Sequence, residues 1–299
     1  MSKNSLLKGV FLVGLGATSY GMLATFVKLA YKEGFTTAEV TSSQFILGIL
    51  GILIINTFQK FKHKEAVEKA TPKNIFHLML AGTSLVMTSV FYYLAVKYID
   101  VSIAIVLLMQ TVWMGVLLEW FLEKRVPSKQ KIISVLIVLI GTVLATNLLN
   151  NQLDIDWRGI LWGMLAAASF TTTMFTANKV ALGISSAQRS LYMLLGGAVI
   201  VFGFGFFTQT TCFNFNIFLK WGIFLALFGT IIPPLLMNAG FPITGIGLGS
   251  IVSALELPVS VLMAFLILNE TVIFSQWIGI ILIIIAIVIM NIKTSKLKN

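Results

Sequence analysis

The sequence predicts an all-α integral membrane protein with ten transmembrane helices, arranged as two inverted five-helix repeats. This prediction rests on an apolar composition, on long apolar runs along the whole chain, and on an internal repeat. The chain has 299 residues, of which 58% are hydrophobic and 11% are charged. Soluble domains usually carry about 25% charged residues. The composition therefore excludes an ordinary soluble protein.

Apolar runs define the predicted spans. A helix of about 20 residues crosses the ~30 Å hydrocarbon core of a bilayer, and the alternating pattern of a membrane β-barrel is absent. The first run is too long for a signal peptide and is predicted to remain as a span. Pro233 and Pro234 are predicted to kink or break the eighth span, because each lacks a backbone donor. The predicted spans are 7–30, 38–58, 75–96, 101–121, 131–149, 158–180, 187–208, 216–238, 245–268 and 272–292.

The distribution of basic residues predicts the orientation. With the N-terminus inside the cell, sixteen of the 21 lysines and arginines fall on the cytoplasmic side and five fall outside. Cytoplasmic loops of membrane proteins carry such an excess. We therefore expect a multi-pass protein of the cytoplasmic (inner) cell membrane with both termini in the cytoplasm. The charged segment 59–73 is then a cytoplasmic loop, and the connection "TQTTCFNFN" lies outside.

An internal repeat divides the chain into residues 1–150 and 151–299. The segment 98–126 aligns with 245–273 without a gap, which places Met109 on Glu256 and Glu123 on Glu270. Upstream, "GATSYG" in the first span resembles "AAASFT" in the sixth. Each half has five spans, so the second half enters the membrane with the opposite orientation. Inverted repeats are common in secondary transporters, whose substrate sites lie near the membrane midplane.

Four segments resemble a known family, the EamA-type transporters of the drug/metabolite transporter superfamily, which includes the bacterial YddG-type amino-acid exporters. They are "FYYLAVKYIDVSIAIVLL", "LEKRV", "SALELPVSVLMAFLILNE" and "QWIGIILIIIA". The resemblance implies ten helices in two inverted repeats. It also implies a central cavity lined by the first, third and fourth helices of each half. The family often has Glu directly before Pro in the ninth helix, whereas here Leu257 separates Glu256 from Pro258.

Glu256 is the strongest candidate for a functional residue. An acid within a membrane span is costly unless it is protonated, paired or hydrated, and such acids mark substrate or ion pathways. At about 100° per residue, Gly249, Ser253, Glu256, Ser260 and Met263 share one stripe of the ninth span. The stripe predicts a binding surface, but a packing seam with a hydrogen-bonded Glu is an alternative.

The matching stripe of the fourth span is more apolar. It includes Ser102, Met109 and Trp113, and Gln110 lies beside it. The two stripes together predict a pocket for an amphipathic solute with an amine and an apolar body. Trp113 also suits ordinary packing.

Further polar residues within spans are candidate substrate contacts. Ser169, Thr173 and Thr176 share a face of the sixth span, Tyr92 lies in the third, and Asn238 lies at the end of the eighth. Ser and Thr side chains also bond to their own helix, so a structural role is the alternative for the first three.

The predicted function is secondary transport of a small organic metabolite by alternating access. An amino acid or a related amine is the first choice, export the preferred direction, and protons a candidate coupling ion. Nucleotide-sugar-like and cationic drug-like solutes are alternatives, as is a lipid-modifying membrane enzyme, although no interfacial acid or histidine cluster supports one. The single Cys212 excludes an intramolecular disulfide, and no metal site, cofactor motif or nucleic-acid-binding patch is predicted despite the net charge of +10. The sequence does not indicate an oligomeric state.

Overall fold

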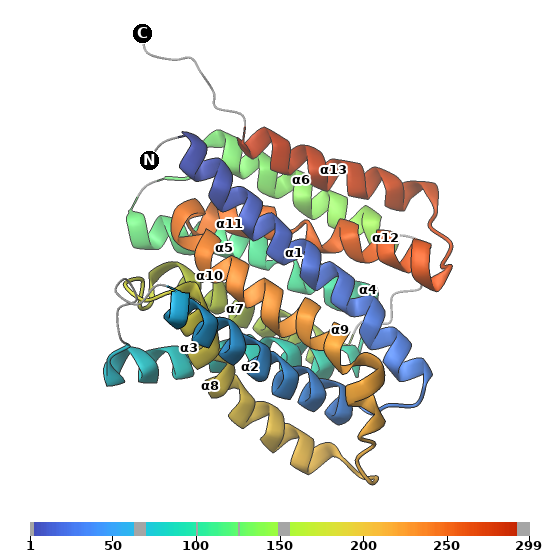
Figure 1. The fold of residues 1–299 in the computed structure, drawn as a ribbon. Helices are drawn as coiled ribbons and strands as arrows, with labels where there is room; N and C mark the ends of the chain where they lie inside the picture. Colours follow the sequence, from blue (N-terminus) through green and yellow to red (C-terminus); the bar gives the residue numbers. More distant parts are fainter. Residues whose placement is uncertain (1–2, 63–69, 100, 125, 149–155, 292–299) are drawn as a thin grey trace.

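The structure is a computed structural model of the chain and describes residues 3–62, 70–99, 101–124, 126–148 and 156–291. In these residues the regular elements are α-helices and short π-helical turns, with no β-strand (Figure 1). The first half contains α1 (Lys3–Lys32), α2 (Thr37–Lys62), α3 (Pro72–Val96), α4 (Val101–Leu108), α5 (Thr111–Glu123) and α6 (Lys129–Ala145). The second half contains α7 (Trp157–Lys179), α8 (Ser186–Thr208), the π-turns η2 (Phe218–Gly222) and η3 (Leu227–Ile231) around α9 (Ile223–Ala226), α10 (Ile232–Thr244), α11 (Ile246–Ser253), α12 (Glu256–Leu268) and α13 (Phe274–Asn291).

The predicted spans all fall on helical segments. Among the described residues, eight helical stretches are long and apolar enough to cross a membrane, and Phe274–Met290 is apolar but shorter. The span predicted at 131–149 corresponds to α6, which has only 17 residues. A total of ten crossings therefore stays a prediction. Residues 63–69 of the predicted cytoplasmic loop, and the boundary between the two predicted repeats, lie outside the described part of the chain.

Two predicted spans are each broken in the middle. The fourth breaks between α4 and α5, where the Gln110 N–H bonds to the Leu107 carbonyl at 3.0 Å instead of continuing the α-helical pattern. The ninth breaks between α11 and α12, where the Leu255 N–H bonds to the Val252 carbonyl at 3.1 Å. Each span therefore consists of two short helices, and the residues at the break leave the regular helical periodicity.

The breaks fix the register of the internal repeat. Helix α11 begins 145 residues after α4 (246 against 101), and α12 begins 145 residues after α5 (256 against 111). The left-handed residues that end α5 and α12, Lys124 (φ 52°) and Asn269 (φ 54°), have the same spacing. Glu256 is thus equivalent to Thr111, and the predicted match with Met109 was wrong by two residues. Both spans are apolar at most positions, so their sequences can be aligned equally well after a shift of one or two residues. The positions of the helix breaks do not allow that shift.

The two halves are interlaced. Helix α1 packs on α10 and α12 of the second half, and α7 packs on α3, α4 and α5 of the first. Equivalent hydrogen bonds join them: the Ser19 hydroxyl donates to the Phe228 carbonyl (3.1 Å), and the Ser169 hydroxyl donates to the Ser84 carbonyl (2.9 Å). Helix α6 pairs with α13, and these two helices lie side by side at one edge of the bundle (Figure 1). The start of α1 and the end of α13 lie at the same end of the bundle, as an even number of crossings requires.

Close helix crossings depend on glycine. A Cβ added to Gly82 of α3 would lie 1.8 Å from the Met193 carbonyl oxygen of α8, and one added to Gly196 would lie 1.9 Å from that of Met79. Small residues let helices in membranes approach closely and gain van der Waals contact. Helices α3 and α8 are therefore closely packed where they cross beside the interior.

Candidate functional site

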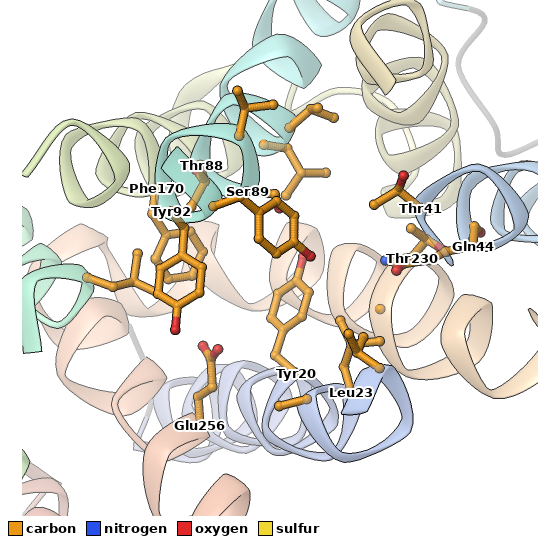
Figure 2. A pocket seen from close by; sticks show the side chains of 18 of the residues that line it. Tyr20, Leu23, Thr41, Gln44, Thr88, Ser89, Tyr92, Phe170, Thr230 and Glu256 are labelled. Atoms are coloured by element: carbon orange, nitrogen blue, oxygen red, sulfur yellow. Dashed lines mark hydrogen bonds between the residues drawn. The ribbon is translucent and has the colours of Figure 1, made fainter. Parts of the chain in front are cut away.

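A cavity of about 420 Å³ lies inside the bundle, and most of its wall is apolar. Residues of α1, α2, α3, α7, α8, η3 and α12 line it, together with the end of α4 and Met109 in the first break (Figure 2). Helices α2 and α8, the second helix of each half, contribute to this wall, although only the first, third and fourth helices of each half were expected. A cavity of this size and composition suits a small ligand held by a few polar groups.

Glu256 projects into this cavity from the first turn of α12 (Figure 2). The break before it directs the side chain to the interior, and Gly21 of α1 allows the close approach. A Cβ on Gly21 would lie 2.5 Å from the Glu256 carbonyl oxygen. Within the described residues the carboxylate has no hydrogen bond or ion pair, so its oxygens are free to bind a ligand.

Aromatic side chains stand beside the acid. Tyr92 of α3 points its hydroxyl toward the Glu256 carboxylate, and the Tyr20 side chain of α1 extends into the cavity beside it (Figure 2). Phe170 of α7 also lines the cavity. The rings of Tyr92 and Tyr93 meet edge to face with centroids 6.2 Å apart. A carboxylate next to tyrosine rings offers both charge and ring faces to a bound cation.

A second polar wall faces the acid across the cavity. It consists of Thr41 and Gln44 of α2 and Thr230 of η3 (Figure 2). The Thr230 hydroxyl lies 3.0 Å from the carbonyl oxygens of both Gln44 and Ala226. The Gln44 amide lies over Gly229, where any Cβ would be 2.4 Å from its nitrogen. The span predicted to kink or break at Pro233 and Pro234 continues as one helical stretch, Phe218–Thr244, and changes to a π-turn just before the prolines. π-turns often occur at functional sites.

The cavity reaches the surface where α1 ends. Lys28 and Tyr31 line this mouth, and the side chain of Lys28 is 52% exposed. Lys28 forms an ion pair with Glu270, which follows α12. Glu33 nearby pairs with Lys220 at 2.9 Å, and this hydrogen bond lowers the pKa of the Glu33 carboxyl. The charged lining residues of the cavity are thus Glu256 in its interior and Lys28 at its mouth.

Four of the twelve residues predicted as substrate contacts line the cavity. They come from three separate parts of the fold: Glu256 and Ser260 from α12, Met109 from the first break, and Tyr92 from α3. The side chain of a fifth, Ser102, lies outside the described part of the structure. The remaining seven lie elsewhere, bonded to other protein groups.

Trp113 and Gln110 do not lie in the cavity wall. The Trp113 indole donates to the Gln110 side-chain oxygen (2.8 Å), and the Gln110 amide donates to the Val106 carbonyl (2.9 Å). The predicted stripe assumed a continuous helix, and the break at Gln110 turns the following residues away. Ser253, just before the second break, donates to the Gly249 carbonyl of its own helix (2.9 Å).

The hydroxyl residues of α7 make helix contacts. Ser169 bonds to the Ser84 carbonyl, and Thr173 lies 2.8 Å from the Ser84 hydroxyl. Thr176 donates to the Thr173 carbonyl in its own helix (2.8 Å). Asn238 is buried beyond the cavity and donates to the Ser190 hydroxyl (2.9 Å). These placements match the packing alternative considered for such residues.

Several lining residues were missed by the sequence analysis. Tyr20, Gln44 and Thr230 are polar residues within apolar spans, and that alone could have marked them. Lys28 was counted only as a charge at the end of a span. Which of these side chains face a cavity depends on helix rotation, which a single sequence does not fix.

The fold and the site define a class: a multi-pass α-helical membrane protein with two related halves around a central cavity. The EamA-like transporter family matches the chain twice, over residues 7–147 and 157–292. The chain therefore belongs to the EamA-like transporter family.

A solved structure described as "Crystal structure of protein" has the same fold. It aligns with a TM-score of 0.76 and 13% sequence identity, over 96% of this chain and 97% of that chain. At this identity the similarity shows the fold alone. No curated protein matches the chain.

Proposed function

We propose that the protein is a secondary transporter of a small amine-bearing metabolite, with an amino acid as the first candidate. The observation that carries the proposal is the carboxylate of Glu256, which has no hydrogen-bond or ion-pair partner among the described residues and lies in a mostly apolar cavity. A buried charge without a partner is costly, and such a group is retained in a membrane protein where it binds a solute or an ion.

The lining suits an amphipathic amine. The ammonium group would bind Glu256 and lie against Tyr20 and Tyr92, because tyrosine rings attract cations. The apolar wall would hold the hydrocarbon part of the solute. The polar wall at Gln44 and Thr230 offers hydrogen-bonding groups to the other end of the same molecule.

The proposed mechanism is alternating access coupled to protons. The Glu256 side chain would bind either the solute amine or a proton, so that loading one releases the other. The cavity is open at one end, and rearrangement of the two halves would expose it at the opposite end. The proposed orientation has both termini in the cytoplasm, and the predicted excess of basic residues on that side supports it. Export is the proposed direction, because the sequence resembles a family that includes amino-acid exporters.

Binding is tested first with purified protein. A panel of amino acids and the amines that lack their carboxyl groups is screened by thermal unfolding. A compound that binds only the folded state adds about 2.7 kcal/mol to the free energy of unfolding at 100 times its Kd, and this gain raises the unfolding temperature. Compounds that stabilise the protein are then tested for flux into proteoliposomes with and without a pH gradient.

The decisive variant is Glu256→Gln, which keeps the shape of the side chain and removes its charge. Glu123→Gln is the control, because Glu123 is exposed at the end of α5. We expect Glu256→Gln to fold, to lose stabilisation by amines, and to lose flux or its dependence on the pH gradient. Wild-type flux with an unchanged pH response in Glu256→Gln would show that Glu256 is structural, and the proposal would fail.

A further inference from the structure

Arg189 joins three helices at the end of the bundle opposite the mouth. It lies in the first turn of α8 and is 2% exposed. Its guanidinium donates to the Asn238 carbonyl of α10 at 2.6 Å, and to the carbonyls of Thr176 (3.3 Å) and Ala177 near the end of α7. Helices α7 and α10 are therefore held together by one cation.

The charge of Arg189 has no acidic partner among the described residues. Its Nε atom, the side-chain oxygen of Asn238 and that of Gln188 also lack hydrogen-bond partners there. Arginine keeps its charge in proteins, and burying a charge without a counter-charge is costly. Buried groups of this kind call for an explanation beyond ordinary packing.

All three contacts lie beyond the closed end of the cavity. At 1.5 Å per residue, Arg189 lies about 18 Å along α8 from the lining residue Val201, and Ala177 about 10 Å along α7 from Phe170. Asn238 follows Thr230 of the lining by eight residues. Met174 of α7 and Met237 of α10 lie between the lining residues of these helices and the Arg189 contacts, and both belong to a buried apolar layer that also includes Val13 and Phe241.

The repeat relates this closed end to the open mouth. The paired Ser19 and Ser169 bonds relate α1 to α7 with a spacing of 150, so Ala177 corresponds to Val27 and Asn178 to Lys28. Val27 and Lys28 both line the open cavity. In the second half, by contrast, the Ala177 carbonyl accepts a hydrogen bond from Arg189, and Asn178 donates to the Phe241 carbonyl of α10.

We propose that Arg189 is a reversible latch that closes the cavity at the end opposite Lys28. The proposal rests on the proposed transport function. Exchange of conformation between the two halves would separate α7 from α10 and expose the guanidinium to water. Hydration would then compensate the guanidinium for its lost carbonyl contacts. Because no acidic partner among the described residues binds the cation, it would hold α7 and α10 together in the closed state and still allow them to separate. Asn178, which donates to the Phe241 carbonyl at 2.5 Å, supports the same closure between α7 and α10.

The test measures access of a water-soluble thiol reagent to the closed end. The reporter is Met174→Cys in a Cys212→Ser background, because Met174 is 1% exposed and lies in the apolar layer. The latch variants are Arg189→Met and Arg189→Lys. The control is Arg158→Met, which removes an exposed arginine that pairs with Asp156. A second reporter, Val138→Cys between α6 and α13, detects general loosening of the protein, because Val138 is fully buried away from the latch.

We expect Arg189→Met to raise the labelling rate of the first reporter by about tenfold or more, the effect of losing one hydrogen bond to a charged group. Arg189→Lys should give an intermediate rate, because an ammonium lacks the planar fork that reaches several carbonyls. Arg158→Met and the second reporter should show no change. If Arg189→Met does not fold, the test uses Arg189→Lys and Asn178→Ala, which should also raise the labelling rate of the first reporter.

An unchanged rate at the first reporter, or an equal rise at both reporters, would overturn the latch. The measurement requires no substrate, so it separates this proposal from the assignment of Glu256. Glu256→Gln is expected to abolish amine binding whatever the outcome at Arg189. Loss of amine binding together with unchanged labelling would leave the transport proposal standing and remove the latch alone.

Discussion

Gly21→Ala tests whether the crossing of α1 and α12 positions Glu256. The added Cβ would lie 2.5 Å from the Glu256 carbonyl oxygen and 2.8 Å from the Val259 Cβ, whereas ordinary contacts begin at 3.4 Å. The two helices must therefore separate by roughly 1 Å at the residue that carries the acid. Overpacking of this kind costs about 1–3 kcal/mol. A displacement of about 1 Å in a binding site is also enough to impair it.

Gly203→Ala is the matched control, because a Cβ on Gly203 of α8 meets no atom within 4 Å. Alanine in a helix is favoured over glycine by roughly 0.5–1 kcal/mol, so this variant should be as stable as the wild type or slightly more stable. We expect Gly21→Ala to unfold at a lower temperature and to lose amine-dependent stabilisation. Equal amine binding in the two variants would refute the reasoning, since Glu256 would then not depend on this crossing for its position.

Two further predictions concern residues outside the cavity. Trp113→Ala should reduce the free energy of unfolding by up to about 3–5 kcal/mol, because packing is lost, while flux per folded molecule is retained. Lower flux in fully folded protein would show that Trp113 contributes to substrate binding. Cys212 is exposed in the connection after α8 and is predicted to lie outside, so a membrane-impermeant maleimide should label intact cells. Labelling only after the membrane is opened would contradict the orientation.

The fold class followed directly from the sequence because hydrophobic length is a physical requirement of the bilayer. The apolar runs and the repeat are both visible in the residues, and the helical segments and the double family match agree with them. The breaks in the fourth and ninth spans were not predicted. At the first break, Met109 and Gln110 are ordinary helix-compatible residues, so the interruption reflects packing between the halves more than local preference.

The candidate site was only partly predictable. Glu256 stood out because an acid inside an apolar span is expensive, and this argument requires no knowledge of its neighbours. Hydroxyl residues gave a weaker signal, because Ser169 and Thr176 satisfy backbone carbonyls as readily as they would bind a solute. Gln44 and Tyr20 reach the cavity only through the rotation of α2 and α1 in the packed bundle.

The two halves share a fold but differ in chemistry at the breaks. The position equivalent to Glu256 is Thr111, which is 1% exposed and lies 2.8 Å from the Thr171 hydroxyl. The first half therefore uses this position to pack against α7, and the second half uses it to place a carboxylate in the cavity. In the proposed alternating-access mechanism, the symmetric frame would provide two related conformations. A single acid near the crossing of the halves would then give both conformations the same binding group, as access to a fixed site from either side requires.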